Sequence, residues 1–181
     1  MVATEEFVAN KQAYLLVGGP GVGKTTIIKE VVARMEGRAG GFYTEEIRAQ
    51  GLRQGFRIVT LDGESATLAH MDIGSPYRVS RYGVDVDSLD RVGVLALRQA
   101  GRDRDVVVID EIGKMELFSP SFREAVLEAL ERGKKVLGTI MLGSHPWADE
   151  IKKRPEVGLI PITRMNRHQV LDKVLRCLRD P

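Results

Sequence analysis

The chain has 181 residues, of which 43% are hydrophobic and 29% charged, and its net charge of +2 excludes the apolar-poor, strongly charged composition of disordered proteins. A single cysteine, Cys177, excludes a disulfide scaffold. No run approaches the ~20 apolar residues of a membrane helix, and the acidic residues 1–6 are unlike a secretory signal. We therefore expect one soluble, cytoplasmic domain over residues 1–181, since domains usually span about 100–200 residues.

The first third of the chain predicts a strand, a helix and a hairpin. Apolar residues 14–17 form a short run that suits a buried strand, and apolar positions recur at helical spacing over residues 24–35 before Gly37. Two β-rich runs, 41–49 and 53–61, flank Gln50-Gly51, which is typical of a tight turn. The pattern from residue 62 to 86 predicts only short strands and loops.

The rest of the chain alternates strands with helices. We expect strands at residues 106–109, 135–141 and 157–162. One helix is expected to begin after Asp87-Ser88 and to end at Gly101, and a second to begin after Ser119 with Pro120 in its first turn. A third helix is expected at residues 147–154. The last is expected to begin after Asn166, which forms a capping box with Gln169. This alternation indicates an α/β fold with a mostly parallel central sheet, helices on both faces and a β-hairpin insertion after the first helix.

A phosphate-binding loop lies between the first strand and the first helix. Glycines let the backbone wrap a triphosphate closely, and the start of the helix directs its positive end at the same phosphates. We expect Lys24 to contact the β- and γ-phosphates, Thr25 to bind Mg²⁺ and Thr26 to add an α-phosphate contact. The pattern G-x-x-x-x-G-K-[ST] is matched by Gly18, Gly19, Pro20, Gly21, Val22, Gly23, Lys24 and Thr25.

Two acids follow the strand at residues 106–109. Ligands of open α/β sheets bind at the carboxyl ends of the strands, so Asp110 and Glu111 should face the phosphate loop. Asp110 fits the role of holding Mg²⁺, and Glu111 fits a base that orients or deprotonates the attacking water. The alternative for Glu111 is an ion pair with Lys114.

Four further segments, in order along the chain, carry a family resemblance. They are GFYTEEIR at residues 41–48, DEIGKMEL at 110–117, VLGTI at 136–140 and NRH at 166–168. With the phosphate loop, they resemble the small nucleoside-triphosphatases first described in thermophiles, whose human member is the cancer-related nucleoside-triphosphatase. The resemblance implies a three-layer P-loop fold and slow, Mg²⁺-dependent hydrolysis of ATP, GTP, CTP and UTP with little base preference.

Several other side chains are candidates for the border of this site. Arg48 is expected either to reach the γ-phosphate or to pair with Glu46, and Thr139 is a candidate γ-phosphate sensor. Residues after the last strand are candidates for contacts to the base, or else for capping and solvation. The remaining border candidates are Thr44, Glu45, Lys114, Glu116, Arg164, Asn166 and Arg167, whereas His145 and Trp147 are expected to have surface or packing roles.

The main alternative function is a nucleoside or nucleotide kinase. Such an enzyme needs a lid that excludes water, and Arg78, Arg81 and Arg91 are the lid candidates. A GTPase switch is disfavoured, because the only Asn-Lys pair, Asn10-Lys11, precedes the phosphate loop and is followed by Gln12-Ala13 rather than x-Asp.

The charge is unevenly distributed along the chain. Residues 151–181 hold eight Lys and Arg against three Asp and Glu, which leaves a net charge of −3 on residues 1–150. This basic segment suits a solvated helix face or a positive field over an anionic ligand. A nucleic-acid-binding module is disfavoured because only 6% of all residues are aromatic. We expect nucleoside triphosphates as partners, no membrane partner, and a monomer.

Overall fold

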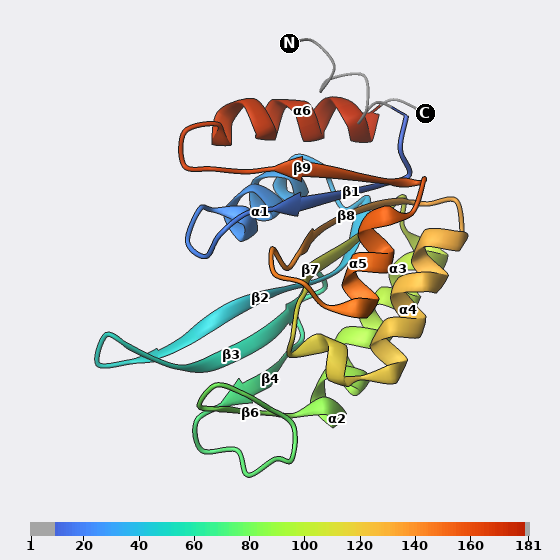
Figure 1. The fold of residues 1–181 in the computed structure, drawn as a ribbon. Coiled ribbons are helices and arrows are strands. Elements are labelled where there is room, and N and C mark those ends of the chain that lie inside the picture. Colours follow the sequence, from blue (N-terminus) through green and yellow to red (C-terminus); the bar gives the residue numbers. More distant parts are fainter. Residues whose placement is uncertain (1–9, 180–181) are drawn as a thin grey trace.

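Nine strands form one sheet in the computed structural model, which describes residues 10–179 (Figure 1). The sheet order is β5-β6-β4-β3-β2-β7-β8-β1-β9, with parallel pairing from β2 to β9 and antiparallel pairing from β2 to β5. The acidic start at residues 1–6 lies outside the described part. The strand bounds are β1 Ala13–Val17, β2 Ala39–Ala49, β3 Leu52–Thr60, β4 Ser65–His70, β5 Arg78–Val79, β6 Tyr82–Val84, β7 Val106–Ile112, β8 Lys135–Ile140 and β9 Val157–Pro161.

Helices cover both faces of the parallel part of the sheet, which confirms the predicted three-layer α/β fold (Figure 1). Helices α1 and α6 pack on one face, and α3, α4 and α5 pack on the other. The helix bounds are α1 Lys24–Ala33, α2 Val86–Ser88, η1 Leu89–Val94, α3 Leu95–Asp103, η2 Glu116–Phe118, α4 Pro120–Glu131, α5 Pro146–Lys153 and α6 Arg167–Arg179.

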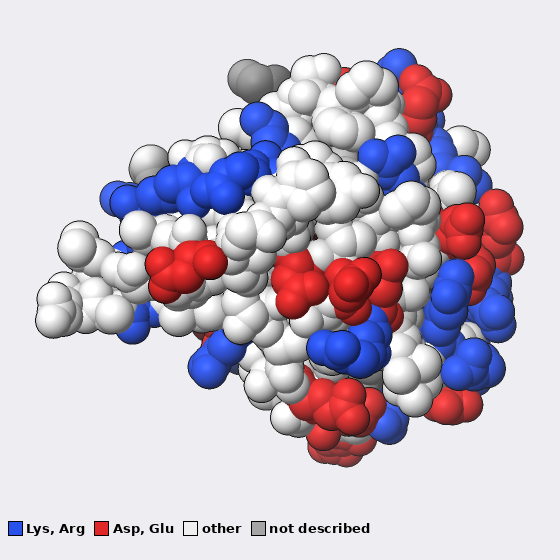
Figure 2. Space-filling model, turned by 90° about the horizontal axis from the view of Figure 1, so that it is seen from below, with Lys and Arg blue, Asp and Glu red and all other residues white. Residues whose placement is uncertain are grey.

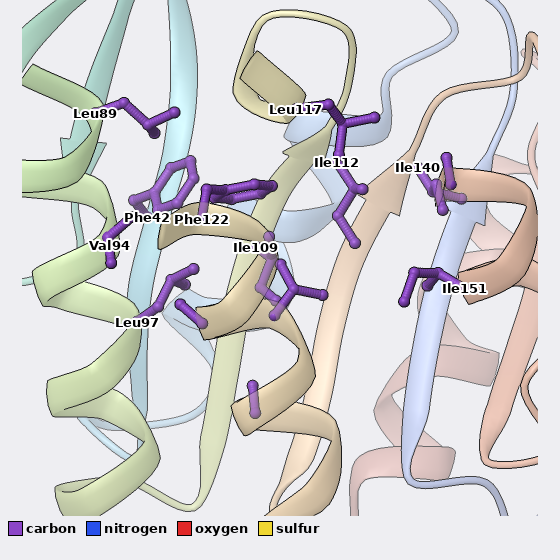
Figure 3. Close-up of a cluster of buried hydrophobic side chains, with 14 of the residues drawn as sticks. Phe42, Leu89, Val94, Leu97, Ile109, Ile112, Leu117, Phe122, Ile140 and Ile151 are labelled. Carbon is purple, nitrogen blue, oxygen red and sulfur yellow. The ribbon is translucent and has the colours of Figure 1, made fainter. Parts of the chain in front are cut away.

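The first four residues of strand β7 show why the central parts of the parallel strands are apolar. Val107 and Ile109 point to the layer of α3, α4 and α5, whereas Val106 and Val108 point to the layer of α1 and α6, and all four are 1% exposed or less. Because successive side chains of a strand alternate between faces, a strand covered on both sides has no place for a polar residue. The buried side chains between the sheet and α3, α4 and α5 form a large hydrophobic cluster, in which Figure 3 shows Ile109 with Phe122 of α4.

The predicted hairpin is present and extends from the carboxyl edge of the parallel strands (Figure 1). Gln50 and Gly51 have φ of 50° and 78°, and two consecutive positive φ angles are what the favoured two-residue hairpin turn requires. The first residues of β2, Ala39 to Phe42, pair with β7, and the rest of the strand pairs with β3. One long strand thus connects the parallel and antiparallel parts.

The helical segment before β7 begins earlier than Asp87-Ser88 predicts. Its cap is Asp85, whose side chain accepts a hydrogen bond from the Ser88 backbone N–H at 2.9 Å, and the helix runs through a π-helical turn, η1, to Asp103. Gly101 lies inside the helix instead of ending it. The wider π turn changes the helical spacing, so a regular 3.6-residue pattern carried through it misplaces the end of the helix.

The predicted cap at Ser119 is confirmed, because its hydroxyl accepts from the Phe122 N–H at 2.9 Å and Pro120 occupies the first turn of α4. The Asn166 side chain instead bonds backwards, to residues before α6. None of the helices within residues 10–179 is long and apolar enough to cross a membrane. The face that Figure 2 shows carries acidic and basic side chains interspersed, without a single dominant sign.

Candidate active site

The phosphate loop connects β1 to α1 and packs against the connection between β9 and α6. A β-carbon at Gly18 would lie 2.5 Å from the carbonyl oxygen of Ile162, and Gly23 has φ of +100°. Glycine is therefore required at the first position for space and at the second for its backbone angle. Lys24 Nζ donates to the carbonyl oxygens of Gly18 at 2.7 Å and Gly19 at 3.1 Å. The ammonium thus lies across the start of the loop.

Asp110 joins the acidic strand to the phosphate loop. The Thr25 hydroxyl donates to Asp110 Oδ2 at 2.7 Å, and the Thr139 hydroxyl of β8 donates to Oδ1 at 2.6 Å. The Thr44 backbone N–H, on β2, supplies a third hydrogen bond. The Asp110 side chain is buried, and this burial raises its pKa although the three hydrogen bonds act in the opposite direction. Four separate segments therefore meet at this carboxylate.

Glu111 lies at an irregularity in the sheet beside Asp110. The regular pairing of β7 with β8 is interrupted between Ile109 and Ile112, so three steps along β7 match two along β8. An extra residue of this kind redirects side chains next to many active sites. Burial raises the pKa of Glu111, and the positive charge of Lys24 partly opposes the rise. Within residues 10–179 Glu111 forms no ion pair, so the predicted alternative, pairing with Lys114, is wrong.

Glu116 is a third acid in the site, after Asp110 and Glu111. A β-carbon at Gly113 would lie 3.0 Å from Glu116 Oε2 and 3.2 Å from Glu111 Oε1, so the two carboxyl groups converge on one glycine. Glu116 is 5% exposed, and its burial, with the negative charge of Glu111, raises its pKa to about 8. The Glu116 carboxyl is therefore mostly protonated at neutral pH. The sequence predicted Glu116 only as a residue at the border of the site.

The charged residues of the hairpin are held in ion pairs, within the hairpin and with α1. Arg48 donates to Glu46 and to the Gly51 carbonyl oxygen, which confirms the predicted alternative of surface pairing. Glu45 pairs with Lys29 of α1 and with Arg57 of β3, which lowers the pKa of Glu45. In Figure 1 the hairpin tip lies well away from the phosphate loop.

The proposed lid arginines bond within the antiparallel part of the sheet and its following helix. Arg78 donates to the carbonyl oxygens of Ile73 and Arg81, Arg81 donates to the Tyr82 hydroxyl, and Arg91 donates to the Ser88 hydroxyl. These bonds are local, and they hold the side chains in β4–β6 and η1 rather than beside the phosphate loop. None of these three arginines bonds to a residue of the phosphate loop within residues 10–179.

The other candidates are placed as follows. Lys114 is exposed, and His145 caps α5 by accepting a hydrogen bond from the Trp147 N–H, in agreement with a packing role. Arg164 is exposed, whereas Arg167 packs directly on Gly23 of the phosphate loop. The Thr44 N–H that reaches Asp110 has no signature in the sequence, because any residue but proline carries the same backbone donor.

Comparisons with known proteins agree with this geometry. The sequence profile of the NTPase family matches residues 13–175. The nucleoside-triphosphatase THEP1 of Thermotoga sp. (strain RQ2) is 46% identical over 165 residues, covering 91% of this chain and 94% of that protein. The human cancer-related nucleoside-triphosphatase is 39% identical over 184 residues, covering 91% and 95%.

A solved structure is similar over nearly the whole chain. The crystal structure of THEP1 from the hyperthermophile Aquifex aeolicus superposes with a TM-score of 0.85 at 39% identity, covering 93% of this chain and 99% of that one. This likeness extends from the phosphate loop to the last helix, as the segments identified in the sequence predicted. The chain belongs to the NTPase family, and its fold is that of the THEP1 P-loop enzymes.

Proposed function

We propose that the chain hydrolyses nucleoside 5′-triphosphates to diphosphate and phosphate, slowly and with broad base specificity. Membership of the NTPase family supports the activity itself. The observation that carries the proposal is the 2.7 Å hydrogen bond from Thr25 to Asp110, since it brings the phosphate loop and the acidic strand into one site. One continuous sheet also supports the proposal that residues 1–181 act as a single domain.

The donor set fits Mg²⁺ better than a transition metal. No group of three or more His, Cys, Asp and Glu side chains that could hold a metal occurs in residues 10–179. Thr25 and Asp110 instead supply two hard oxygen donors in contact with each other. Mg²⁺ is typically bound by one or two protein oxygens together with phosphate oxygens and water. When bound, Mg²⁺ would neutralise charge on the β- and γ-phosphates.

The phosphate loop is proposed to hold the substrate through its backbone N–H groups and the start of α1. Such groups favour anions without a counter-charge from each side chain. Lys24 is proposed to turn from the Gly18 and Gly19 carbonyl oxygens to the β- and γ-phosphates. The complete set of proposed phosphate contacts is Gly18, Gly19, Pro20, Gly21, Val22, Gly23, Lys24, Thr25 and Thr26.

Glu111 is proposed as the base that orients and deprotonates the attacking water. Its pKa is raised by burial, and a carboxylate becomes a stronger base as its pKa approaches the working pH. It also has no competing ion pair in the described part of the chain. Lys24 would stabilise the negative charge that develops on the transferred phosphoryl group.

Slow turnover follows from the arrangement of the arginines. An arginine directed at the γ-phosphate accelerates hydrolysis by about 10³–10⁵-fold in related P-loop enzymes. On β2 and β3, Arg48 is paired with Glu46 and Arg57 is paired with Glu45. We expect turnover by the isolated protein to fall far below the upper part of the usual range, about 10³ s⁻¹.

Phosphate release from ATP, GTP, CTP and UTP, with Mg²⁺ and with excess EDTA, tests the proposal. The natural protein should release phosphate from all four substrates, and EDTA should stop it. Glu111→Gln should still bind nucleotide but lose about 10²–10⁴-fold in turnover, the usual contribution of a positioned base. The exposed Glu30→Gln is the matched control and should turn over as the natural protein does.

The same assay separates hydrolysis from phosphoryl transfer. Added nucleosides or nucleoside monophosphates should leave the rate of phosphate release unchanged. Loss of ATP that requires such an acceptor, without free phosphate, would identify a kinase instead. Undiminished phosphate release by Glu111→Gln would remove that residue from its proposed catalytic role.

A further inference from the structure

Arg167, the first residue of α6, packs its guanidinium against the phosphate loop. A β-carbon at Gly23 would lie 2.7 Å from Arg167 Nε, 2.8 Å from Cζ and 3.2 Å from Nη2. The planar group thus occupies the space that a side chain at Gly23 would fill. Gly23 and Arg167 lie far apart in the sequence, and their contact brings a cation from the last helix onto the nucleotide-binding loop.

This arginine has no partner in the described part of the protein. Arg167 forms no hydrogen bond or ion pair within residues 10–179, and its Nε is buried with its hydrogen-bonding capacity unused. By contrast, Arg98 pairs with Glu128 and Arg104 pairs with Asp62. No ion pair within the described residues holds the guanidinium, so its positive charge beside the nucleotide-binding loop is available to a ligand.

The sheet order places Arg167 at the nucleoside end of a bound triphosphate. The phosphate loop follows β1, which has β8 and then β7 on one side and β9 on the other. Asp110 and Glu111, on β7, lie toward the first side and mark the position of the γ-phosphate. The β9–α6 connection, which carries Arg167, lies on the second side. The sugar and base of a nucleotide held between them would therefore point toward Arg167.

The neighbouring amide is already engaged. Asn166 Oδ1 accepts from the Thr163 N–H at 2.8 Å, and Asn166 Nδ2 donates to the Pro161 carbonyl oxygen at 3.1 Å. Side-chain amides distinguish bases by pairing with donors and acceptors on their edges. Because both polar atoms of the Asn166 side chain form hydrogen bonds within the connection, its amide is not available to pair with a base, whereas the Arg167 guanidinium is. Every base presents a π-face to such a cation.

We propose that Arg167 is a nucleotide-binding residue that stacks its guanidinium on the base of any bound triphosphate. The contact strengthens binding of the nucleoside end without selecting among bases, and it takes no part in the reaction at the γ-phosphate. This inference rests on the proposed hydrolysis of nucleoside triphosphates and adds the means by which that site accepts all four.

Steady-state hydrolysis of ATP, GTP, CTP and UTP by Arg167→Ala tests the inference, with inorganic tripolyphosphate as a competitive inhibitor that lacks a nucleoside. Arg167→Ala should raise KM about 10-fold for each of the four substrates, the size of one stacking contact, and change kcat less than twofold. The inhibition constant of tripolyphosphate should stay the same in both proteins. Arg167→Lys keeps the charge but not the plane, and should resemble Arg167→Ala.

Arg176→Ala, an exposed position on the same helix, is the matched control and should leave every KM unchanged. An unchanged KM in Arg167→Ala, or a rise confined to one base, would overturn the inference. So would a tripolyphosphate inhibition constant that rises with KM, or a tripolyphosphate that does not compete with ATP in the natural protein. Failure of the proposed function is distinct from all of these, because the natural protein would then release no phosphate from any triphosphate.

Discussion

The two sides of the phosphate loop differ in how their charged groups are satisfied. On the side of β7, Asp110 receives three hydrogen bonds from three different elements, and the Glu111 and Glu116 carboxyl groups crowd against Gly113. On the side of β9, Arg167 packs on the loop without any partner among the described residues. The side of the proposed reaction is thus preorganised before substrate binds, whereas on the other side Arg167 is left to gain a partner from a ligand.

This contrast suggests a division of labour between the two sides. Preorganised groups accelerate a reaction because they need not rearrange when charge develops. A contact that serves only to hold the substrate has no such requirement, and tolerance of different bases favours a surface without fixed donors and acceptors. The following predictions test whether the two sides are as independent as their geometry indicates.

The largest effect is expected from Lys24→Ala, which removes the cation of the reacting side. Loss of a preorganised charged donor at the phosphates should lower kcat/KM by about 10³-fold, because the negative charge of the triphosphate is left uncompensated. Lys29→Ala, on the exposed side of the same helix, should keep most of the activity. Nucleotide binding measured by calorimetry should also be lost, and normal affinity in Lys24→Ala would mean that the nucleoside side suffices for binding.

Glu116→Gln should change how stability depends on pH. The pKa of Glu116 is raised from 4.5 to about 8 in the folded protein, so between these values the folded state holds a proton that the unfolded state has released. The contribution is complete below about pH 4.5 and is lost as the pH rises to about 8, with a slope of about 1.4 kcal/mol per pH unit. Glu116→Gln should remove this decline.

Urea unfolding of the nucleotide-free protein in EDTA, from pH 5 to 8, measures that prediction. The difference in unfolding free energy between Glu116→Gln and the natural protein should grow steadily with pH in favour of the variant. The exposed Glu30→Gln should follow the natural protein throughout. Parallel curves for Glu116→Gln and the natural protein would show that the buried carboxyl does not carry the extra proton.

Thr139→Val should weaken the support of Asp110 without changing shape. The substitution removes the hydroxyl that donates to Asp110 Oδ1 and so deprives the buried carboxylate of one hydrogen bond, at a cost of about 1–3 kcal/mol in unfolding free energy. Thr139→Ser, which restores the hydroxyl, should recover most of the loss. Equal stability of the Val and Ser variants would show that packing, not the hydrogen bond, determines the effect.

The smallest effect separates backbone strain from displacement of Arg167. Gly23 and Gly37 both have positive φ, but a β-carbon at Gly37 meets nothing within 4 Å, whereas one at Gly23 meets Arg167. Gly23→Ala and Gly37→Ala should each lose about 1 kcal/mol of stability, and only Gly23→Ala should raise the KM for ATP. A raised KM in both variants would mean that strain alone disturbs the site.

The parallel part of the fold and the positions of Lys24, Thr25 and Asp110 could be predicted from sequence, because continuous apolar runs and fixed motif spacing are local signals. Strands β4 to β6 could be anticipated only as short strands and loops, since their sequences lack the continuous apolar runs that mark β1, β7 and β9. The burial of Glu116 likewise depends on tertiary packing. The contact of Arg167 with Gly23 joins opposite ends of the chain, so no local pattern carries it.

The contacts of the phosphate loop with Ile162 and Arg167 have a consequence for synthesis. The loop leaves the ribosome before β8, β9 and α6, the elements that flank and contact it. Strand β1 therefore has neither of its neighbours until β8 has been made. The nucleotide site can close only after α6 has been made, and a chain cut short before α6 would keep an intact loop motif without a complete site.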